Sequence, residues 1–469
     1  MERLSRNSNQ PVLPIKVVQF GEGNFLRAFV DWMINGLNEK TDYNAGVAIV
    51  QPLANGLTDM LTHQDGLYHH IMQGLEGDQQ IDEAILNTSV QKAINPFADT
   101  KAYFDLAELD TLELVFSNTT EAGIAFDNSD KPAEGALANT FPGKLTQFLK
   151  RRFDHFKGAE DSGLSIVPCE LIADNGVHLK KAILDYVELW QLGEDFKNWI
   201  ENHNYFANTL VDRIVPGYPR EEIDTILNRI GVEDKLVVKS ESFHLFVIQA
   251  PEQVQKAFPA DKHGFNVKYV EDINPFRTQK VRILNGAHTS MVPVGLLSGV
   301  ETVSEAVDDE IVGQFVRKTI FEEIVPLISI PGEDPKEFAD QVIMRFRNPF
   351  IRHELMSISL NSISKYKVRV LPTVLDFIDQ KGALPKRLLF SLACLIKFYV
   401  SDDFSKKDDP AVLAFFEEEK ESADLVTKTL SNESFWGQDL TKISGLEAEV
   451  TEFFNEISAG NVKEIVHEL

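Results

Sequence analysis

The first half of the chain alternates short, mostly apolar runs with segments of helical periodicity. The run at 15–20 is followed by a glycine turn and then by apolar residues spaced as on one face of a helix, up to Leu37. A second apolar run at 47–50 begins about 30 residues after the first, which is the length of one βαβ unit. Further strands are predicted at 112–116, 164–167, 236–238 and 243–248. This alternation favours a largely parallel sheet with helices on both faces.

The second half of the chain has a different period. After about residue 275 the strand-like runs stop, and apolar residues recur at i, i+3 and i+4, which is typical of amphipathic helices. These helices are predicted at 276–298, 303–327, 335–346, 351–360, 371–379, 386–402, 410–429 and 446–457. The change of period predicts a sheet domain at 1–275 and a helical domain at 276–469.

The turn between the first strand and the first helix, Gly21-Glu22-Gly23, has the spacing of a dinucleotide-binding turn. The first glycine permits the tight bend, the second lets a pyrophosphate approach the backbone, and the helix N-terminus attracts its negative charge. Leu26 replaces the third glycine of the usual fingerprint. The predicted fold class is therefore α/β, with an extended Rossmann-type doubly wound sheet domain followed by an all-helical C-terminal domain.

The candidate cofactor-binding residues belong to this turn and to a polar loop after a later strand. They are Phe20, Gly21, Gly23, Asn24, Phe25, Arg27, Asn118, Thr120 and Glu121. Arg27 either contacts a phosphate or is a solvated helix residue, and the polar loop either faces the nicotinamide or is only a loop. Residues 50–52, Val-Gln-Pro, contain neither an acid for the adenosine ribose nor an arginine for a 2′-phosphate. These residues alone therefore leave the choice between NAD and NADP open.

Charge and cysteine content narrow the classes of partner. The 469 residues include 46 basic and 72 acidic side chains, a net charge of −26, which repels nucleic acid and anionic lipid. We therefore expect no nucleic-acid and no membrane partner, although a local basic pocket can still bind a small anion. The two cysteines, Cys169 and Cys394, form no disulfide framework, and a reducing cytoplasm fits best. The N-terminal residues also lack the apolar stretch of a signal peptide.

The segment 277–288, at the start of the helical domain, carries Lys280, Asn285 and His288. At about 100° per residue, an α-helix places these three at roughly 0°, 140° and 80°, within one face. A lysine whose pKa is lowered toward neutrality exchanges the proton of an alcohol, while an amide and an imidazole hold the developing oxyanion. Gly286 thins the helix for close approach. The row formed by Lys280, Asn285 and His288 predicts an enzyme that interconverts an alcohol and a carbonyl without a metal. The alternative is that these three polar residues only form the solvent-facing side of the helix.

The chain resembles the long-chain mannitol dehydrogenase family of zinc-independent polyol and sugar-acid dehydrogenases. The motifs that carry the resemblance are 19–27 (Gln-Phe-Gly-Glu-Gly-Asn-Phe-Leu-Arg), Lys280-x4-Asn285-x2-His288 and 211–216 (Val-Asp-Arg-Ile-Val-Pro). The resemblance implies NAD as cofactor, Lys280 as general acid/base, and Asn285 and His288 as groups that polarise the carbonyl. Residues 19–32 are most similar to a branch that acts on a keto-uronate in hexuronate catabolism, which implies a small sugar-acid substrate.

A uronate carries a carboxylate, which in an acidic protein requires local cations. Cations crowd the stretch 345–369, at Arg345, Arg347, Arg352, Lys365, Lys367 and Arg369. The resemblance implies substrate-binding residues at Asn361 and Lys365, and at Asp212 in the 211–216 motif. Alternatively, each of these cations is an ordinary surface charge.

One stretch departs from the relatives of this branch. Mannitol and mannonate enzymes carry Ser-Cys-Asp-Asn after a central strand, where this chain has Pro-Cys-Glu-Leu at 168–171. Leu171 cannot donate a hydrogen bond to an oxyanion, so that role is vacant or passes to Asn175 or to a backbone group. The departure argues against a mannonate oxidoreductase or a mannitol 2-dehydrogenase.

Other chemistries find less support in the sequence. The HExxH zinc motif fails at His353-Glu354, because residue 357 is serine, and we expect no metal. A nucleophilic Cys169 would need a neighbouring base that the sequence does not place there. A non-catalytic nucleotide or sugar-acid sensor on the same fold would keep the glycine turn, yet it would have no need of Lys280.

Overall fold

The computed structural model describes residues 1–77, 79–133, 135–460 and 462–469. The chain forms two compact units. The first holds Met1–Gly74 and Gln80–Ile273, and the second holds Asn274–Leu469 together with the short segment Leu75–Gln79. The predicted sheet domain followed by a helical domain is confirmed as the fold class.

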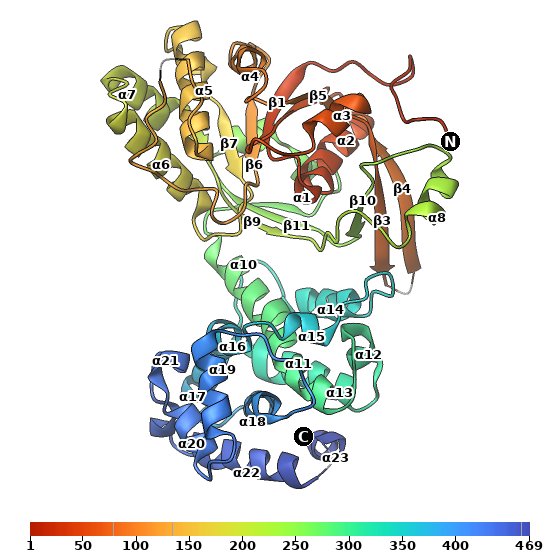
Figure 1. The fold of residues 1–469 in the computed structure, drawn as a ribbon, viewed down its shortest axis with the longest axis vertical. Helices are drawn as coiled ribbons and strands as arrows, with labels where there is room; N and C mark the ends of the chain where they lie inside the picture. Colours follow the sequence, from red (N-terminus) through yellow and green to blue (C-terminus); the bar gives the residue numbers. More distant parts are fainter. Residues whose placement is uncertain (78, 134, 461) are drawn as a thin grey trace. The chain divides into compact units, whose positions relative to one another are not determined.

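A six-stranded parallel sheet forms the centre of the first unit (Figure 1). Its order is β5 (Val90–Ile94), β2 (Gly46–Val50), β1 (Ile15–Phe20), β6 (Leu114–Ser117), β7 (Ser165–Pro168) and β8 (Tyr205–Phe206). The chain runs outward from β1 in one direction through β2 and in the other through β6, so the sheet is doubly wound with its switch point at β1. The strands predicted at 15–20, 47–50, 112–116 and 164–167 are confirmed within a few residues.

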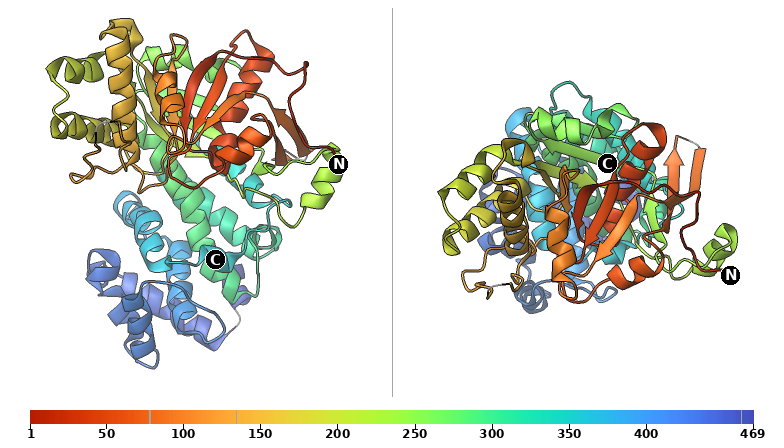
Figure 2. Two further views of the ribbon diagram at one scale, coloured as in Figure 1. Left: turned by 45° about the horizontal axis from the view of Figure 1, so that its top comes forward. Right: turned by 90° about the horizontal axis from the view of Figure 1, so that it is seen from above.

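Both faces of this sheet are buried under helices, which explains why its strands are continuous apolar runs. On one face, α2 (Val30–Lys40) packs Met33 and Leu37 into the core that contains Val17 and Phe116. The other face is covered by α4 (Thr100–Ala107), α5 (Phe141–Phe156), α6 (Asn175–Leu189) and α7 (Glu194–His203). The yellow and olive helices α5 to α7 lie together on one side of the sheet in both views of Figure 2.

Two three-stranded sheets complete the first unit. One has the order β10 (Val238–Glu241), β3 (Tyr68–Glu76), β4 (Gln79–Asn87), and the other β12 (Val267–Val270), β11 (Leu245–Gln249), β9 (Asn208–Asp212). The strands predicted at 236–238 and 243–248 thus lie outside the main sheet. The pattern did not predict β4, because five of its nine residues are exposed and it has no clear apolar period.

After Val270 the described residues form helices and loops. The α-helices are α10 (Asn274–Gln279), α11 (Gly286–Leu297), α12 (Val303–Asp308), α13 (Val312–Lys318), α14 (Pro335–Phe346), α15 (Leu355–Ile358), α16 (Ser362–Arg369), α17 (Leu371–Lys381), α18 (Lys386–Val400), α19 (Pro410–Glu419), α20 (Leu425–Leu430), α21 (Glu433–Trp436), α22 (Leu446–Ala459) and α23 (Val462–Glu468). Within the described ranges, none is long and apolar enough to cross a membrane.

Several predicted helices have wrong boundaries. The single helix predicted at 303–327 is broken because the Asp309 carboxylate accepts the backbone N–H groups of Ile311 and Val312, which starts α13. The single helix predicted at 410–429 is also two helices, α19 and α20. Helix α16 was not predicted, because serines and cations interrupt its apolar period. It follows Asn361, whose φ of 55° is left-handed.

Candidate functional site

The glycine turn lies at the carboxyl end of β1, between the ends of its two neighbours in the sheet. The Gly21 N–H donates to the Val50 carbonyl at 3.1 Å, and the Asn118 N–H donates to the Phe20 carbonyl at 3.0 Å. Gly21 has a φ of 119°, and a Cβ on it would lie 2.9 Å from the Asn118 carbonyl oxygen. Only glycine fits there, and the turn occupies the switch point at which doubly wound sheets bind nucleotides.

Gly23 differs from Gly21. It precedes the short helix α1 (Asn24–Arg27) with φ −65° and ψ 168°, and a Cβ on it would meet no protein atom within 4 Å. The continuous helix predicted after the turn is interrupted, since Ala28 and Phe29 separate α1 from α2. The Phe25 ring stacks on Phe29 with ring centroids 4.9 Å apart. Phe20 is fully buried, so only its backbone borders the turn.

The open space at Gly23 allows a clean test of the cofactor site. Gly23→Val should fold with unchanged thermal stability, because its extended backbone suits valine and no protein atom opposes the new side chain. The same side chain should obstruct a pyrophosphate at the turn and raise the NADH dissociation constant by about tenfold or more. Fluorescence titration with NADH measures this, and an unchanged constant would remove the turn from the site.

Arg27 is not the exposed phosphate ligand or solvated helix residue considered above. It is only 2% exposed, and its guanidinium lies over the Tyr68 ring, 5.0 Å from the centroid. Its donors reach the Glu22 carbonyl at 3.1 Å and the Asn24 Oδ1 at 2.8 Å. The prediction of a phosphate contact is therefore corrected: Arg27 shapes the turn from inside the protein.

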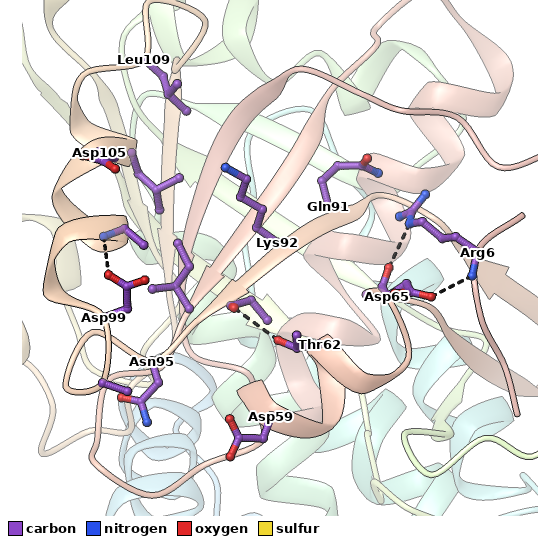
Figure 3. Close-up of a pocket in the computed structure, with 16 residues that line it drawn as sticks. Arg6, Asp59, Thr62, Asp65, Gln91, Lys92, Asn95, Asp99, Asp105 and Leu109 are labelled. Atoms are coloured by element: carbon purple, nitrogen blue, oxygen red, sulfur yellow. Dashed lines mark hydrogen bonds between the residues drawn. The ribbon is translucent and has the colours of Figure 1, made fainter. Parts of the chain in front are cut away.

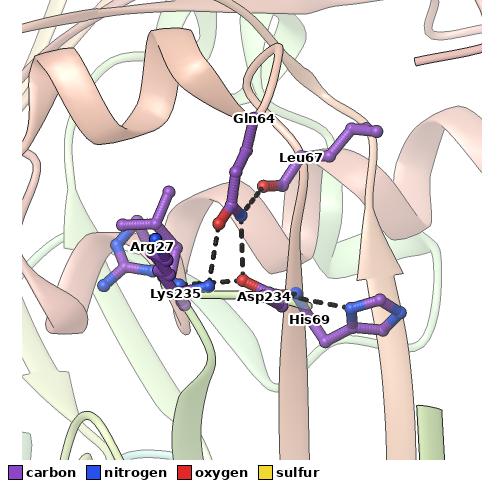
Figure 4. Close-up of polar contacts among 7 residues, drawn as sticks. Arg27, Gln64, Leu67, His69, Asp234 and Lys235 are labelled. Atoms are coloured by element: carbon purple, nitrogen blue, oxygen red, sulfur yellow. Dashed lines mark hydrogen bonds and ion pairs between the residues drawn. The ribbon is translucent and has the colours of Figure 1, made fainter. Parts of the chain in front are cut away.

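A second set of buried contacts fixes the segment against which Arg27 packs (Figure 4). Arg27 donates to the Leu236 carbonyl at 2.5 Å. The Asp234 carboxylate accepts from the Gln64 side chain at 2.9 Å and from the His69 N–H at 2.6 Å. These contacts join the glycine turn, α3 (Thr58–His63) with its following loop, and the chain before β10.

The polar loop after β6 also borders the turn. The Asn118 amide donates to the Cys169 carbonyl at 2.8 Å. Glu170, which sequence reasoning did not select, is buried and accepts from the Ser117 hydroxyl at 3.0 Å and from the Thr119 N–H at 3.0 Å. Burial raises the pKa of Glu170. Thr120 and Glu121 are exposed beyond this anchored loop, with Thr120 at a φ of 74°.

The structure corrects the role considered for Asn175. This residue is fully buried at the start of α6. Its amide donates to the Thr209 hydroxyl at 2.9 Å and the Glu170 carbonyl at 3.1 Å, and its Oδ1 accepts the Thr209 N–H at 2.9 Å. Asn175 therefore joins β7 to β9 and is not placed to bind substrate. Leu171 is 61% exposed, and Asp212 is buried at the end of β9.

In the second unit, Lys280 and Asn285 are the first and last residues of a π-helix, Lys280–Asn285, between α10 and α11. The α-helix predicted across 276–298 is therefore wrong in this segment. Each N–H of a π-helix bonds to the carbonyl five residues earlier, so Asn285 lies one turn beyond Lys280. His288 follows one α-helical turn later. The π-helix aligns three side chains that an α-helix would spread over roughly 140°.

Gly286 brings this row close to helix α16. A Cβ on Gly286 would lie 3.1 Å from the Arg369 carbonyl oxygen, so the two helices approach closely at this residue. Lys280 and Asn285 are partly exposed, whereas His288 is 8% exposed.

The surroundings of His288 contain a residue that sequence reasoning discarded. The His288 ring stacks on Phe346 with centroids 4.2 Å apart, and the His353 ring lies 5.2 Å away at 78°. Burial and the charge of Lys365 lower the pKa of His353. Burial and the charge of Arg369 lower the pKa of Lys365, whose ammonium donates to the Ile358 carbonyl at 2.8 Å. His353 thus lies beside His288, and Lys365 lies near enough to His353 to lower its pKa. A search of the sequence for a zinc motif could not reveal these contacts.

The other cations of 345–369 are mostly engaged elsewhere. Arg347 pairs with Asp308 at 3.1 Å, and Arg352 pairs with Glu301 at 3.2 Å; both pairs are exposed. Lys367 faces Gly437, where a Cβ would lie 3.5 Å from its ammonium nitrogen. Asn361 is exposed, and its backbone carbonyl accepts the N–H of Lys365 at 3.1 Å.

A pocket of about 870 Å³ lies along edge strand β5, between α3 and α4 (Figure 3). Its lining includes charges of both signs, such as Lys92, Asp99 and Asp105, and none of the predicted site residues. Among the residues that the structure describes, no group of three or more histidines, cysteines or acids is placed to hold a metal ion.

The first unit is a doubly wound sheet with a nucleotide-type turn, and the second is a helical unit that carries the row Lys280, Asn285, His288. Together they define a Rossmann-type oxidoreductase that acts on CH–OH groups. Residues 15–262 match the mannitol dehydrogenase Rossmann domain, and residues 272–458 match the mannitol dehydrogenase C-terminal domain. The chain belongs to the mannitol dehydrogenase family, which confirms the resemblance.

Similar proteins cover nearly the whole chain. The altronate oxidoreductase of Bacillus subtilis (strain 168) is 44% identical over 464 residues, 97% of this chain and 96% of that protein. The altronate oxidoreductase of Bacteroides thetaiotaomicron is 44% identical over 462 residues, with the same shares covered.

Two solved structures share the fold. A substrate-free D-sorbitol dehydrogenase has a TM-score of 0.83 at 23% identity, covering 96% of this chain and 95% of that one. The mannitol 2-dehydrogenase of Pseudomonas fluorescens, in a ternary complex with NAD and D-mannitol, has a TM-score of 0.67 at 19% identity, covering 100% and 96%. At these identities the likeness concerns the fold alone.

Proposed function

We propose that the protein catalyses the reversible, NAD-dependent reduction of D-tagaturonate to D-altronate in hexuronate catabolism. The observation that carries the proposal is the row Lys280, Asn285, His288, with the ammonium group of Lys365 in the same cluster. The relatives named altronate oxidoreductase, 44% identical over 97% of the chain, support the choice of substrate.

The first unit offers a site that fits a dinucleotide. The space at Gly23 is open, Gly21 allows the tight bend, and Asn118 borders the turn. NAD would lie there, with the exposed Thr120 and Glu121 on the next loop, and when bound in its reduced form it supplies a hydride to the substrate carbonyl. The mannitol 2-dehydrogenase that shares this fold binds NAD, which favours this cofactor.

The residue at the end of β2 does not decide between NAD and NADP. Gln51 is buried, and its amide donates to the Leu53 carbonyl at 2.8 Å while its oxygen accepts the Thr58 hydroxyl at 2.7 Å. Its side chain therefore holds the loop after β2, and the support for NAD comes from the fold relative instead.

The second unit supplies the proton and the oxyanion contacts. Lys280 donates its proton to the carbonyl oxygen as that oxygen becomes a hydroxyl, and takes the proton back in the reverse reaction. Asn285 and His288 donate hydrogen bonds to the same oxygen while negative charge develops on it. The ammonium of Lys365 pairs with the substrate carboxylate, with Asn361 and Asp212 as further polar contacts to the sugar acid. Since the proton comes from lysine, this mechanism uses no metal ion.

A screen of NADH oxidation against tagaturonate, fructuronate and fructose tests the proposal. We expect the largest kcat/KM with tagaturonate, and little activity with neutral fructose, because fructose has no carboxylate for Lys365. Activity on fructose alone would defeat the carboxylate contact, and a preference for fructuronate would assign the mannonate reaction. Binding of NADH without oxidation of any of the three would indicate a sensor.

A further inference from the structure

A buried polar network holds the glycine turn from within the first unit. The Gln19 side chain donates to the Gly21 carbonyl at 3.0 Å, and the Arg27 guanidinium donates to the Glu22 carbonyl at 3.1 Å. Gln19 is fully buried and Arg27 is nearly so. Two successive carbonyls of the turn are therefore fixed by buried side chains, and any change in this network acts directly on the turn.

Asp31, in the first turn of α2, lies at the centre of the network and is fully buried. Its Oδ2 lies 3.1 Å from the Tyr68 hydroxyl and 3.4 Å from the Gln19 amide nitrogen. The Tyr68 hydroxyl also lies 2.9 Å from the Arg27 carbonyl oxygen. Asp31 is thus linked to the turn through Gln19 and to Arg27 through Tyr68.

The hydrogen count of these contacts bears on the charge of Asp31. A tyrosine hydroxyl has one hydrogen, and a carbonyl oxygen can only accept. If the Tyr68 hydrogen is donated to the Arg27 carbonyl, the 3.1 Å contact between the Tyr68 and Asp31 oxygens is a hydrogen bond only when Asp31 carries a proton. An ionised Asp31 would instead have to take the Tyr68 hydrogen away from the Arg27 carbonyl. The other carboxylate oxygen of Asp31 is also buried and has no hydrogen-bond partner among the described residues, so ionisation would leave one charged oxygen unpaired, which favours the neutral acid.

The electrostatic surroundings of Asp31 also favour the neutral acid. Burial raises the pKa of Asp31 from 3.8 to about 7, although Tyr68, Gln19 and Arg27 oppose the shift. Arg27 and Tyr68 are the titratable groups facing Asp31, and Glu22 and Asp234 act on Arg27 in turn. His70, also near Arg27, has a pKa far below its ordinary value because it is buried, and stays neutral. Asp31 is therefore a member of this network that changes charge near neutral pH.

We propose that Asp31 is a positioning residue that carries a proton when the anionic dinucleotide binds, so that cofactor binding is coupled to proton uptake. The inference rests on the NAD site proposed above. A neutral Asp31 completes the contact with Tyr68 and leaves the buried charge of Arg27 to attract a pyrophosphate at the turn. An ionised Asp31 offsets that charge. Cofactor affinity is thus highest below the pKa of Asp31 and falls as the pH rises through it.

Calorimetric titration of the full chain with NADH, in buffers of different ionisation enthalpy, measures the protons taken up. NADH is suitable because it has no group that titrates near neutrality. We expect proton uptake by the wild type near pH 7, and a dissociation constant that rises roughly fivefold or more between about pH 6 and pH 8. Asp31→Asn should bind without proton uptake, with a dissociation constant that stays at the low-pH value of the wild type. Asp42→Asn, at an exposed acid just after α2, is the matched control and should behave as the wild type.

The outcomes separate this inference from the function on which it rests. Binding of NADH by the wild type without proton uptake, or uptake that persists in Asp31→Asn, would overturn the inference alone. Absence of NADH binding at any pH would overturn the proposed cofactor. If Asp31→Asn does not fold, Tyr68→Phe decides: loss of the hydroxyl that stabilises the ionised acid should move the affinity transition to higher pH, and an unmoved transition contradicts the role of Asp31.

Discussion

Lys280→Ala is expected to lower kcat for tagaturonate reduction by roughly 10²- to 10⁴-fold, the contribution of a positioned general acid. The NADH dissociation constant should stay unchanged, because the cofactor contacts proposed above lie in the first unit. Steady-state kinetics together with NADH titration separate the two effects. The π-helix makes the result sharper, since alanine leaves the backbone that positions Asn285 intact.

Arg282→Ala is the matched control for the lysine variant. Arg282 lies in the same π-helix, and its guanidinium pairs with Asp376 of α17. Loss of such a partly exposed pair costs about 1 kcal/mol or less, so we expect folding and kcat close to those of the wild type. Retention of activity by Lys280→Ala would mean that the proton carrier is another group. An equal loss in both variants would mean that the π-helix itself had been disturbed.

The fold was largely predictable, because strands that are buried on both faces are continuous apolar runs and amphipathic helices have a clear period. The predictions failed where tertiary contacts decide the local structure. Five of the nine residues of strand β4 are exposed, and the Asp309 carboxylate interrupts the single helix predicted at 303–327. The π-helix at 280–285 could not be predicted either, because over six residues the pattern of apolar positions does not distinguish a π-helix from an α-helix.

The candidate site was predictable where the local backbone geometry itself requires a particular residue, as it requires glycine at position 21. Residue type alone did not predict the role where burial decides it. Arg27 and Asn175 are polar and adjacent to the expected site, yet both are buried and join neighbouring segments. His353 was discarded as a metal ligand, and its contact with His288 depends on packing between segments distant in sequence.

Lys365→Gln is expected to raise KM for tagaturonate about ten- to hundredfold with a smaller change in kcat, because a hydrogen bond to a charged group contributes about 1.5–3 kcal/mol. The Lys365 ammonium is held by the Ile358 carbonyl at 2.8 Å, so it is already placed before a substrate binds. Burial and the nearby Arg369 lower its pKa. A substrate carboxylate would reverse this shift by stabilising the charged form, which is why removal of the charge should act mainly on substrate binding.

Lys367→Gln, two residues further along α16, is the matched control for this prediction. Its ammonium nitrogen would lie 3.5 Å from a Cβ built on Gly437, which is not among the proposed site residues, so KM should remain near the wild-type value. The residual reduction of fructose, which has no carboxylate, should be equal in Lys365→Gln and the wild type. A parallel loss of activity on fructose and on tagaturonate would show that Lys365 supports the shape of the site and does not bind the carboxylate.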